Sequence, residues 1–140
     1  MSAESPGGLV APYKPGPDGQ LRPYLLLTLL GVKPGLEIEI LGLVDTGADR
    51  SVLPIDFAEE LGYTVDDLEP RDVIQVEGSA SAWVAKKPCQ AFVDGLPDTR
   101  FEIEPVFVAG LNVLWGRADL MMNFKLVVSE KDQELTLQPS

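Results

Sequence analysis

Short runs of apolar residues, separated by turn residues, recur along the whole of this chain. The run at residues 21–30 predicts a buried strand, with Pro23 near its start, where a missing N–H group is tolerated. After a turn at residues 33–35, residues 36–40 alternate between apolar and charged side chains, which predicts a half-buried strand. The apolar run then continues to Val44, which indicates that this strand enters the core.

Strand and turn signals continue to the C-terminus. A long hairpin is predicted at residues 72–89, and further strands are predicted at residues 90–93, 100–108, 113–115, 124–128 and 134–137. The short turn between the last two strands favours a hairpin over a terminal strand that reaches another chain. Signals that recur about every 8–12 residues favour a small closed β-barrel or a sandwich.

Two segments have helical features. Residues 54–62 begin with a proline, which suits a first helical turn, and end at a glycine, which suits a C-terminal cap. Residues 117–123 predict a helical turn or a short helix. The expected fold is therefore all-β with one or two short helices. Residues 1–19, rich in proline and glycine, predict a flexible arm that precedes a single domain at residues 20–140.

The composition narrows the class of protein. A chain of 140 residues with 45% hydrophobic residues suits one globular domain with a core of its own. The formal net charge of −11 argues against nucleic acid or an anionic membrane as a partner. No apolar run approaches the ~20 residues of a membrane-spanning helix. The first residues lack the basic start and apolar stretch of a secretory signal.

Missing residue types exclude several kinds of chemistry. The chain has no histidine, which excludes Ser-His-Asp and Cys-His catalysis and any zinc site that uses imidazole. Its one cysteine, Cys89, cannot form an internal disulfide, and we interpret it as a small buried hydrophobe in a protein of the reducing cytosol. Acidic pairs such as Asp66 and Asp67 lack the spacing of a calcium loop. We therefore predict no metal, no other cofactor and a cytoplasmic location.

One stretch combines an apolar strand with a carboxylate. Leu43 and Val44 are followed at once by Asp45, Thr46 and Gly47. A strand that ends there places one carboxylate in a tight loop, in which the threonine hydroxyl can bond to the backbone and the glycine permits a close turn. This layout suits a carboxylate that holds a water molecule rather than a metal ion.

These residues resemble the active-site loop of the aspartic proteases. The resemblance extends through Ala48 and the apolar sequel at residues 51–53, and Asp49 is typical of the retroviral type, the retropepsins. Residues 113–117 resemble the apolar-apolar-Gly-Arg segment of the same family. Trp115 is bulkier than the aliphatic residue usual before this glycine, so the packing there must differ. The resemblance implies the small closed β-barrel of these proteases.

The resemblance also implies roles for the loop residues. The residues that support the catalytic group are Thr46, Gly47, Ala48, Asp49 and Arg117. Asp45 would bind and activate water, Thr46 would hydrogen-bond to the loop of a second copy, and Gly47 would offer its backbone to the substrate. Asp49 and Arg117 would form an ion pair that ties the loop to the short helix. An exposed Arg117 without that partner is the alternative.

The predicted hairpin and two apolar residues would shape the substrate site. Small residues at the hairpin tip suit a flap that opens and closes over a substrate, although the tip departs from the glycine-rich retroviral flap and an ordinary mobile hairpin is the alternative. The candidate flap residues are Gly78, Ser79, Ala80 and Trp83. Trp83 would be either a pocket wall or a packing residue of the hairpin. Val52 and Leu114 are the candidate pocket walls, and plain core positions are the alternative for both.

Hydrolysis of a peptide bond by carboxylates needs two of them, one ionised and one protonated, and their apparent pKa values belong to the pair. This chain has one Asp-Thr-Gly sequence and is too short for two lobes. We therefore predict an aspartic endopeptidase that acts on polypeptides as a symmetric homodimer, with Asp45 of each copy at the two-fold axis. A catalytically silent dimerisation or peptide-binding module of the same fold is the alternative.

Overall fold

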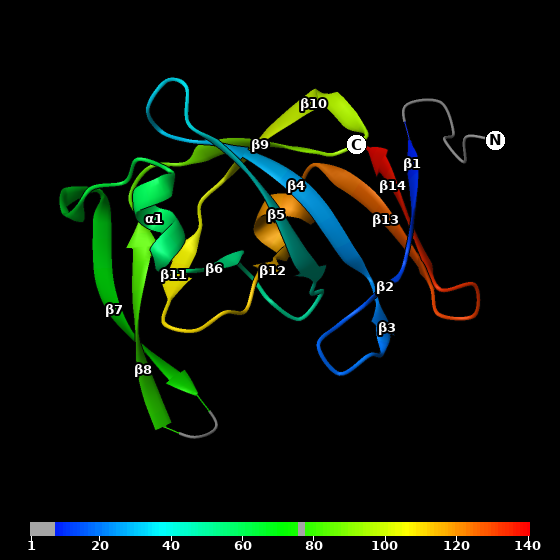
Figure 1. Cartoon of the computed structure of the whole chain (residues 1–140), viewed down its shortest axis with the longest axis horizontal. Helices are drawn as coiled ribbons and strands as arrows, with labels where there is room; N and C mark the ends of the chain where they lie inside the picture. The colour runs from blue at the N-terminus through cyan, green and yellow to red at the C-terminus, as the bar shows by residue number, and fades with distance from the viewer. Residues whose placement is uncertain (1–7, 76–77) are drawn as a thin grey trace.

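The computed structural model describes residues 8–75 and 78–140, most of which form strands (Figure 1). The strands are β1 (Leu9–Pro12), β2 (Lys14–Pro15), β3 (Leu21–Arg22), β4 (Tyr24–Leu30), β5 (Glu37–Val44), β6 (Val52–Pro54), β7 (Leu68–Gln75), β8 (Gly78–Ala85), β9 (Cys89–Val93), β10 (Leu96–Ile103), β11 (Val106–Val108), β12 (Leu114–Trp115), β13 (Phe124–Ser129) and β14 (Glu134–Pro139). The helical segments are α1 (Asp56–Glu60), the 3₁₀ turn η1 (Val65–Asp67) and the π-type turn η2 (Arg117–Met121). The prediction of an all-β chain with short helices is confirmed.

One sheet of nine strands forms the body of the molecule and curls into a half-barrel (Figure 1). Its order is β10-β9-β4-β5-β12-β6-β11-β8-β7. Strand β4 lies between antiparallel β5 and β9, and its apolar run buries Leu25, Leu27 and Leu29. The predicted buried strand is therefore present, although Pro23 separates it from the short strand β3.

Strand β5 leads from the surface into the core. At its start Glu37 and Glu39 are exposed, whereas Ile40 and Val44 are buried. The strand pairs with β4 over seven residues, which fixes its register against a largely buried strand. Because β5 ends at Val44, it delivers the next residue, Asp45, at the edge of the core.

Three short strands cross beside the end of β5. Strand β12 runs parallel to β5 and antiparallel to β6, and β11 runs parallel to β6. In this register Leu114 pairs with both Leu43 and Val52. Leu43 and Val52, which flank the Asp45 loop, are therefore joined by Leu114, from far along the chain.

The helical segments follow the sequence signals closely. A left-handed glycine, Gly62 (φ 85°), follows helix α1. The N–H of the next residue, Tyr63, donates to the Ala58 carbonyl at 2.9 Å. This is the expected glycine cap. The proline at position 54 ends β6 rather than starting the helix. Turn η2 occupies the second predicted helical segment.

The terminal strands form a separate sheet of order β1-β14-β13. The predicted C-terminal hairpin is confirmed, because β13 and β14 pair along their full lengths. Strand β1 pairs with the other edge of β14, and the Tyr13 N–H donates to the Gln133 carbonyl at 2.8 Å. The expectation of a flexible arm up to residue 19 is therefore wrong for residues 9–15. Proline is tolerated there because β1 and β2 are edge strands.

The predicted hairpin is present but displaced toward the N-terminus, since its arms are β7 and β8. Residues 76 and 77, which belong to the predicted arm and tip, lie outside the described residues. Within the described part of the chain, no helix is long and apolar enough to cross a membrane.

Cys89 is buried at the start of β9, as expected for a small hydrophobe. Burial raises the pKa of its thiol to about 11. The thiol is therefore protonated at neutral pH and unsuited to nucleophilic chemistry.

Candidate active site

Asp45 directly follows β5 and sits in a tight turn. Its N–H donates to the Trp115 carbonyl at 3.1 Å, and its carbonyl accepts a hydrogen bond from the Ala48 N–H at 3.2 Å. Its Oδ1 atom accepts a hydrogen bond from the Gly47 N–H at 2.9 Å. The side chain is half-buried, whereas Thr46 and Gly47 are exposed. One chain therefore presents the carboxylate and the neighbouring backbone at its surface.

The start of η2 is hydrogen-bonded to this loop. The Arg117 N–H donates to the Ala48 carbonyl at 2.9 Å, and the Ala118 N–H donates to the Asp49 carbonyl at 2.8 Å. The ion pair predicted between Asp49 and Arg117 is also present. Both of its side chains are more than half exposed, so the ion pair adds little stability. The backbone hydrogen bonds therefore contribute most to holding the loop against η2.

Gly116 explains how the two segments come so close. A Cβ atom at this position would lie 2.3 Å from the carbonyl carbon of Arg50 and 2.5 Å from its oxygen. These distances are well inside van der Waals contact with backbone atoms that cannot rotate away. Position 116 therefore admits only glycine while the loop keeps its place.

The bulky Trp115 is accommodated by a second glycine. Its side chain is fully buried, and its Nε1 donates a hydrogen bond to the Leu25 carbonyl at 2.9 Å. A Cβ atom at Gly42, on β5, would lie 2.7 Å from that Nε1 atom. The indole, together with the Val113 Cγ1 atom at 2.6 Å, therefore occupies the space that a side chain at position 42 would take. The sequence predicted altered packing at Trp115 but did not indicate Gly42 as its cause.

Two buried polar residues lie on the inner side of the loop, and sequence reasoning did not assign them a role. Ser51 is fully buried, and Asp119 is 6% exposed. The Ser51 Oγ accepts a hydrogen bond from the Gly116 N–H at 3.1 Å, and the Asp119 Oδ2 accepts one from the Ser51 N–H at 3.2 Å. The one sequence feature that could have indicated a buried Asp119 is its position directly before the apolar residues Leu120 and Met121, which complete η2.

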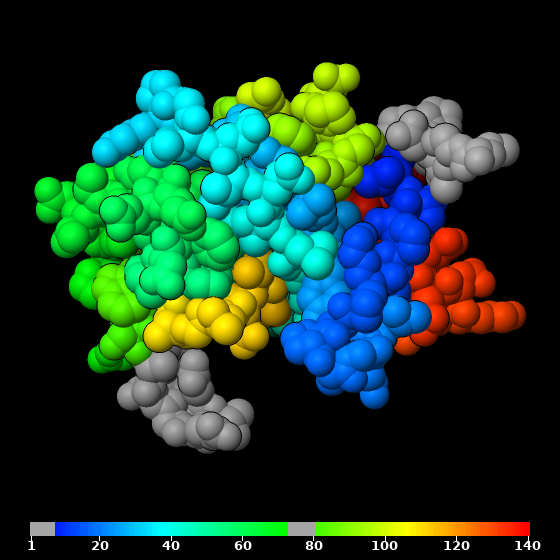
Figure 2. Space-filling model, viewed as in Figure 1, coloured from blue at the N-terminus to red at the C-terminus, as the bar shows by residue number. Residues whose placement is uncertain are grey.

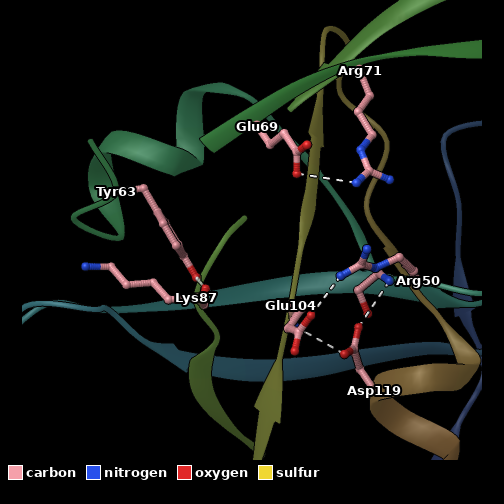
Figure 3. Close-up of polar contacts among 8 residues, drawn as sticks. Arg50, Tyr63, Glu69, Arg71, Lys87, Glu104 and Asp119 are labelled. Carbon is pink, nitrogen blue, oxygen red and sulfur yellow. Dashed lines mark hydrogen bonds and ion pairs between the residues drawn. The ribbon is translucent and has the colours of Figure 1, made fainter. Parts of the chain in front are cut away.

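Charged side chains lie near the buried Asp119 (Figure 3). Arg50 donates a hydrogen bond to Glu104 at 2.9 Å, close to Asp119, and a second pair, Arg71 and Glu69 at 3.3 Å, projects from β7. A hollow of about 400 Å³ opens here, lined by Asp49, Arg50, Glu104, Ala118 and Asp119. These polar walls do not suit an apolar ligand.

A different, apolar cavity of about 470 Å³ lies beside the end of β5 (Figure 2). The N-terminal hairpin β2–β3, the outer face of β5 and the segment before β12 form its walls. It is lined by Pro15, Gly16, Pro17, Tyr24, Leu41, Leu43, Leu111, Asn112, Val113 and Leu114. No aspartate, glutamate, lysine or arginine lines it, although 24% of the chain is charged. This volume and lining are typical of sites that take apolar groups.

The two candidate pocket walls lie together, but they are not equivalent. Val52 and Leu114 are a cross-strand pair, and both are half-buried. Leu114 lines the apolar cavity, whereas Val52 does not. The geometry therefore supports Leu114 as a pocket wall and places Val52 beside it on the neighbouring strand.

The candidate flap residues lie on β8. Gly78, Ser79 and Ala80 pair with the end of β7. Trp83 is half-buried and pairs with Phe107 on β11. It lines a hollow of about 270 Å³ with residues 70–72 and 81, away from the apolar cavity. This placement agrees with a packing role for Trp83 at the base of the hairpin.

Comparison with known proteins agrees with this architecture. The aspartyl protease family model matches residues 35–102, a range that includes the Asp45 loop and the β7–β8 hairpin. A crystal structure of a retropepsin-like aspartic protease from Rickettsia conorii has a similar fold, with a TM-score of 0.58 and 21% identity. That similarity covers 94% of this chain and 90% of the other. The fold of this chain is retropepsin-like. No curated protein matches it.

The retropepsin-like fold confirms the predicted fold class. The chain has one Asp-Thr-Gly sequence, whereas general acid and general base catalysis by carboxylates needs two groups in different protonation states. Across residues 8–75 and 78–140, no group of three or more cysteine, aspartate or glutamate side chains is arranged to hold a metal ion.

Proposed function

We propose that this retropepsin-like protein is an aspartic endopeptidase that acts as a homodimer. The observation that carries the proposal is the placement of Asp45. Its carboxylate follows a buried strand, the backbone of its loop is bonded to residues 115–118, and Leu43, two residues earlier, lines an apolar cavity. Such a fixed loop suits a carboxylate that must meet its counterpart from a second copy at a defined distance.

In this mechanism the two Asp45 carboxyl groups share one proton. The ionised group takes a proton from water, whose oxygen attacks the peptide carbonyl carbon, while the protonated group donates to the carbonyl oxygen. The group that took the proton from water then gives it to the nitrogen as the C–N bond breaks, and the other group recovers a proton from a hydroxyl of the intermediate, so that the amine leaves and a carboxylic acid forms. Thr46 bonds across the two-fold axis, and Gly47 presents its backbone to the extended substrate.

The other site residues hold the loop or contact the substrate. Ala48, Asp49 and Arg117 hold the loop against η2, and Leu114, with Val52 beside it on β6, forms one wall of a side-chain pocket. Strands β7 and β8 form a flap, with Gly78, Ser79 and Ala80 near the substrate and Trp83 at the base. The substrates are polypeptides, with no nucleic acid, membrane or cofactor required, in the cytoplasm.

Charge favours activity at mildly acidic pH. Two copies together carry −22, twice the −11 of one chain, and this repulsion opposes association at neutral pH. Partial protonation of carboxylates weakens the repulsion and also suits a pair that shares one proton. A pH–rate profile that is flat or rises toward pH 8 would contradict this part of the proposal.

The decisive experiment is cleavage of a mixed peptide library by the wild-type protein, by Asp45→Asn and by the control Asp98→Asn, which removes an exposed carboxylate on β10. We expect Asp45→Asn to lose at least about 10³-fold in kcat/KM and the control to lose nothing. Sedimentation measured in parallel should show that all three proteins dimerise. If the wild type dimerises and binds peptides without cleaving them, the silent module is the correct function. Equal cleavage by wild type and Asp45→Asn would exclude Asp45 as the catalytic group.

A further inference from the structure

The buried side chain of Asp119 stands in an unusual position for an acid. Asp119 is the one buried aspartate or glutamate in the described part of the chain, and its carboxylate contacts the backbone of the buried Ser51. Asp119 Oδ2 accepts a hydrogen bond from the Ser51 N–H, and its Oδ1 accepts one from the Glu104 N–H, each at 3.2 Å. One carboxylate therefore joins the loop after Asp45 to the connection between β10 and β11 (Figure 3).

Ser51 transmits this contact to the loop. Its N–H is bonded to Asp119, its Oγ accepts from the Gly116 N–H at 3.1 Å, and its carbonyl accepts from the Val106 N–H at 2.9 Å. All its polar groups are thus bonded in a residue that has no exposed surface. Because Ser51 ends the loop that starts at Asp45, its position limits where the loop can lie.

The chemistry of the side chain explains why a carboxylate occupies this position. Two backbone N–H groups need two acceptor oxygens, which aspartate supplies. An asparagine has one acceptor oxygen, and its NH₂ group would face the other N–H donor. A buried donor without an acceptor is costly, so the backbone would shift to find one.

We propose that Asp119 is a positioning residue for the proposed reaction: it holds Ser51 and Glu104 together and so sets the placement of the Asp45 carboxylate. The assignment rests on the proposed function only where catalysis is the readout. It predicts a defect in the chemical step rather than in peptide binding, because Asp119 is absent from the lining of the apolar cavity.

The test compares Asp119→Asn with Leu120→Val, a matched control. Leu120 is the next residue of η2 and is 1% exposed, so its truncation lowers stability without touching Ser51. We expect Asp119→Asn to lower kcat about ten- to hundred-fold with KM nearly unchanged, as for a small misplacement of a catalytic group. Leu120→Val should lower the melting temperature and leave kcat unchanged.

A second readout does not depend on catalysis. In Asp119→Asn, the amide protons of Ser51 or Glu104 should shift in NMR spectra and exchange faster with solvent, and they should not do so in Leu120→Val. Unchanged amides or an unchanged kcat in a folded Asp119→Asn would overturn the proposal.

The proposal can still be tested if the variant does not fold or if the wild-type protein is inactive. If Asp119→Asn does not fold, fast exchange of the Ser51 and Glu104 amides in the wild type would overturn the assignment, and slow exchange would support it. If the wild-type protein cleaves no peptide, the proposed function fails by itself, and the amide readout still decides whether Asp119 positions the loop.

Discussion

The loop at residues 45–51 is joined to the body of the molecule along its length, whereas the β7–β8 hairpin is joined only at its base. The loop exchanges backbone hydrogen bonds with residues 115–118 and with Val106, and Asp119 bonds to it from inside. In the described part of the hairpin, β11 pairs with β8 only at residues 82–84. Beyond that point the two arms pair with each other alone.

This difference shows how one sheet can serve two needs. A catalytic carboxylate must keep its place to within a fraction of an ångström, and many short bonds from separate segments achieve that. An element that admits and covers a peptide needs fewer attachments, so that it can open without disturbing the rest. The proposed function assigns these two requirements to two regions of one nine-stranded sheet.

The largest loss of stability is expected for Gly116→Ala, which disturbs the close backbone contact between the loop and η2. The added Cβ would lie 2.3 Å from the Arg50 carbonyl carbon, so the loop or η2 must move. We expect a loss of about 3 kcal/mol in the free energy of unfolding, at the upper end for overpacking, together with a large loss of activity. Urea denaturation and peptide cleavage measure the two effects.

The neighbouring substitution Arg117→Ala is the control for this prediction. It removes the exposed ion pair to Asp49 and keeps the backbone bonds, so we expect a loss of at most about 1 kcal/mol. Equal losses for the two variants would mean that the ion pair, and not the close backbone contact, fastens the loop.

The second prediction concerns the support beneath the loop. Gly42→Ala places a Cβ 2.7 Å from the Trp115 Nε1, so we expect a loss of about 2 kcal/mol in the wild-type background. In a Trp115→Leu background the same change should cost less, because the indole is gone and only the contact with Val113 Cγ1 at 2.6 Å remains. A double-mutant cycle by urea denaturation measures this coupling. Additive losses would contradict the complementary packing of Gly42 and Trp115.

The smallest effect concerns the base of the hairpin and appears at high pH. The Tyr63 hydroxyl donates a hydrogen bond to the carbonyl of Lys87, just after β8, at 2.9 Å. Burial raises the pKa of Tyr63 and also that of Cys89. The Cys89 thiol has a pKa of 9.0 without burial and about 11 in the folded chain. The stability that burial of the neutral thiol provides is complete below pH 9 and decreases as pH rises toward 11.

Urea midpoints between pH 7 and pH 10.5 test this prediction. Cys89→Ala should remove part of the decrease, and the remainder should follow Tyr63. A midpoint that stays constant to pH 10.5 would show that neither group is held neutral by the fold.

The comparison also shows which features a sequence can reveal. The Asp45 loop, the glycine cap at Gly62 and the C-terminal hairpin were predicted because their signals lie within a few consecutive residues. The roles of Gly42 and Asp119 were not predicted, because they depend on partners far along the chain. Asp119 bonds to Ser51, 68 residues earlier, and Trp115 bonds to Leu25, 90 residues earlier. Strand β1 was missed for the same reason, since its partner β14 lies at the opposite end of the chain.

The terminal sheet has a consequence for how the chain can be divided. Strand β14 lies between β1 and β13, and both of its edges are occupied by its own chain. A chain that ended at Gln133 would keep the two outer strands with a vacant slot between them. The missing strand, supplied as a separate peptide of residues 134–140, has the backbone donors, acceptors and apolar face to fill that slot. We therefore expect that a chain truncated before β14 can bind this peptide and regain the three-stranded terminal sheet.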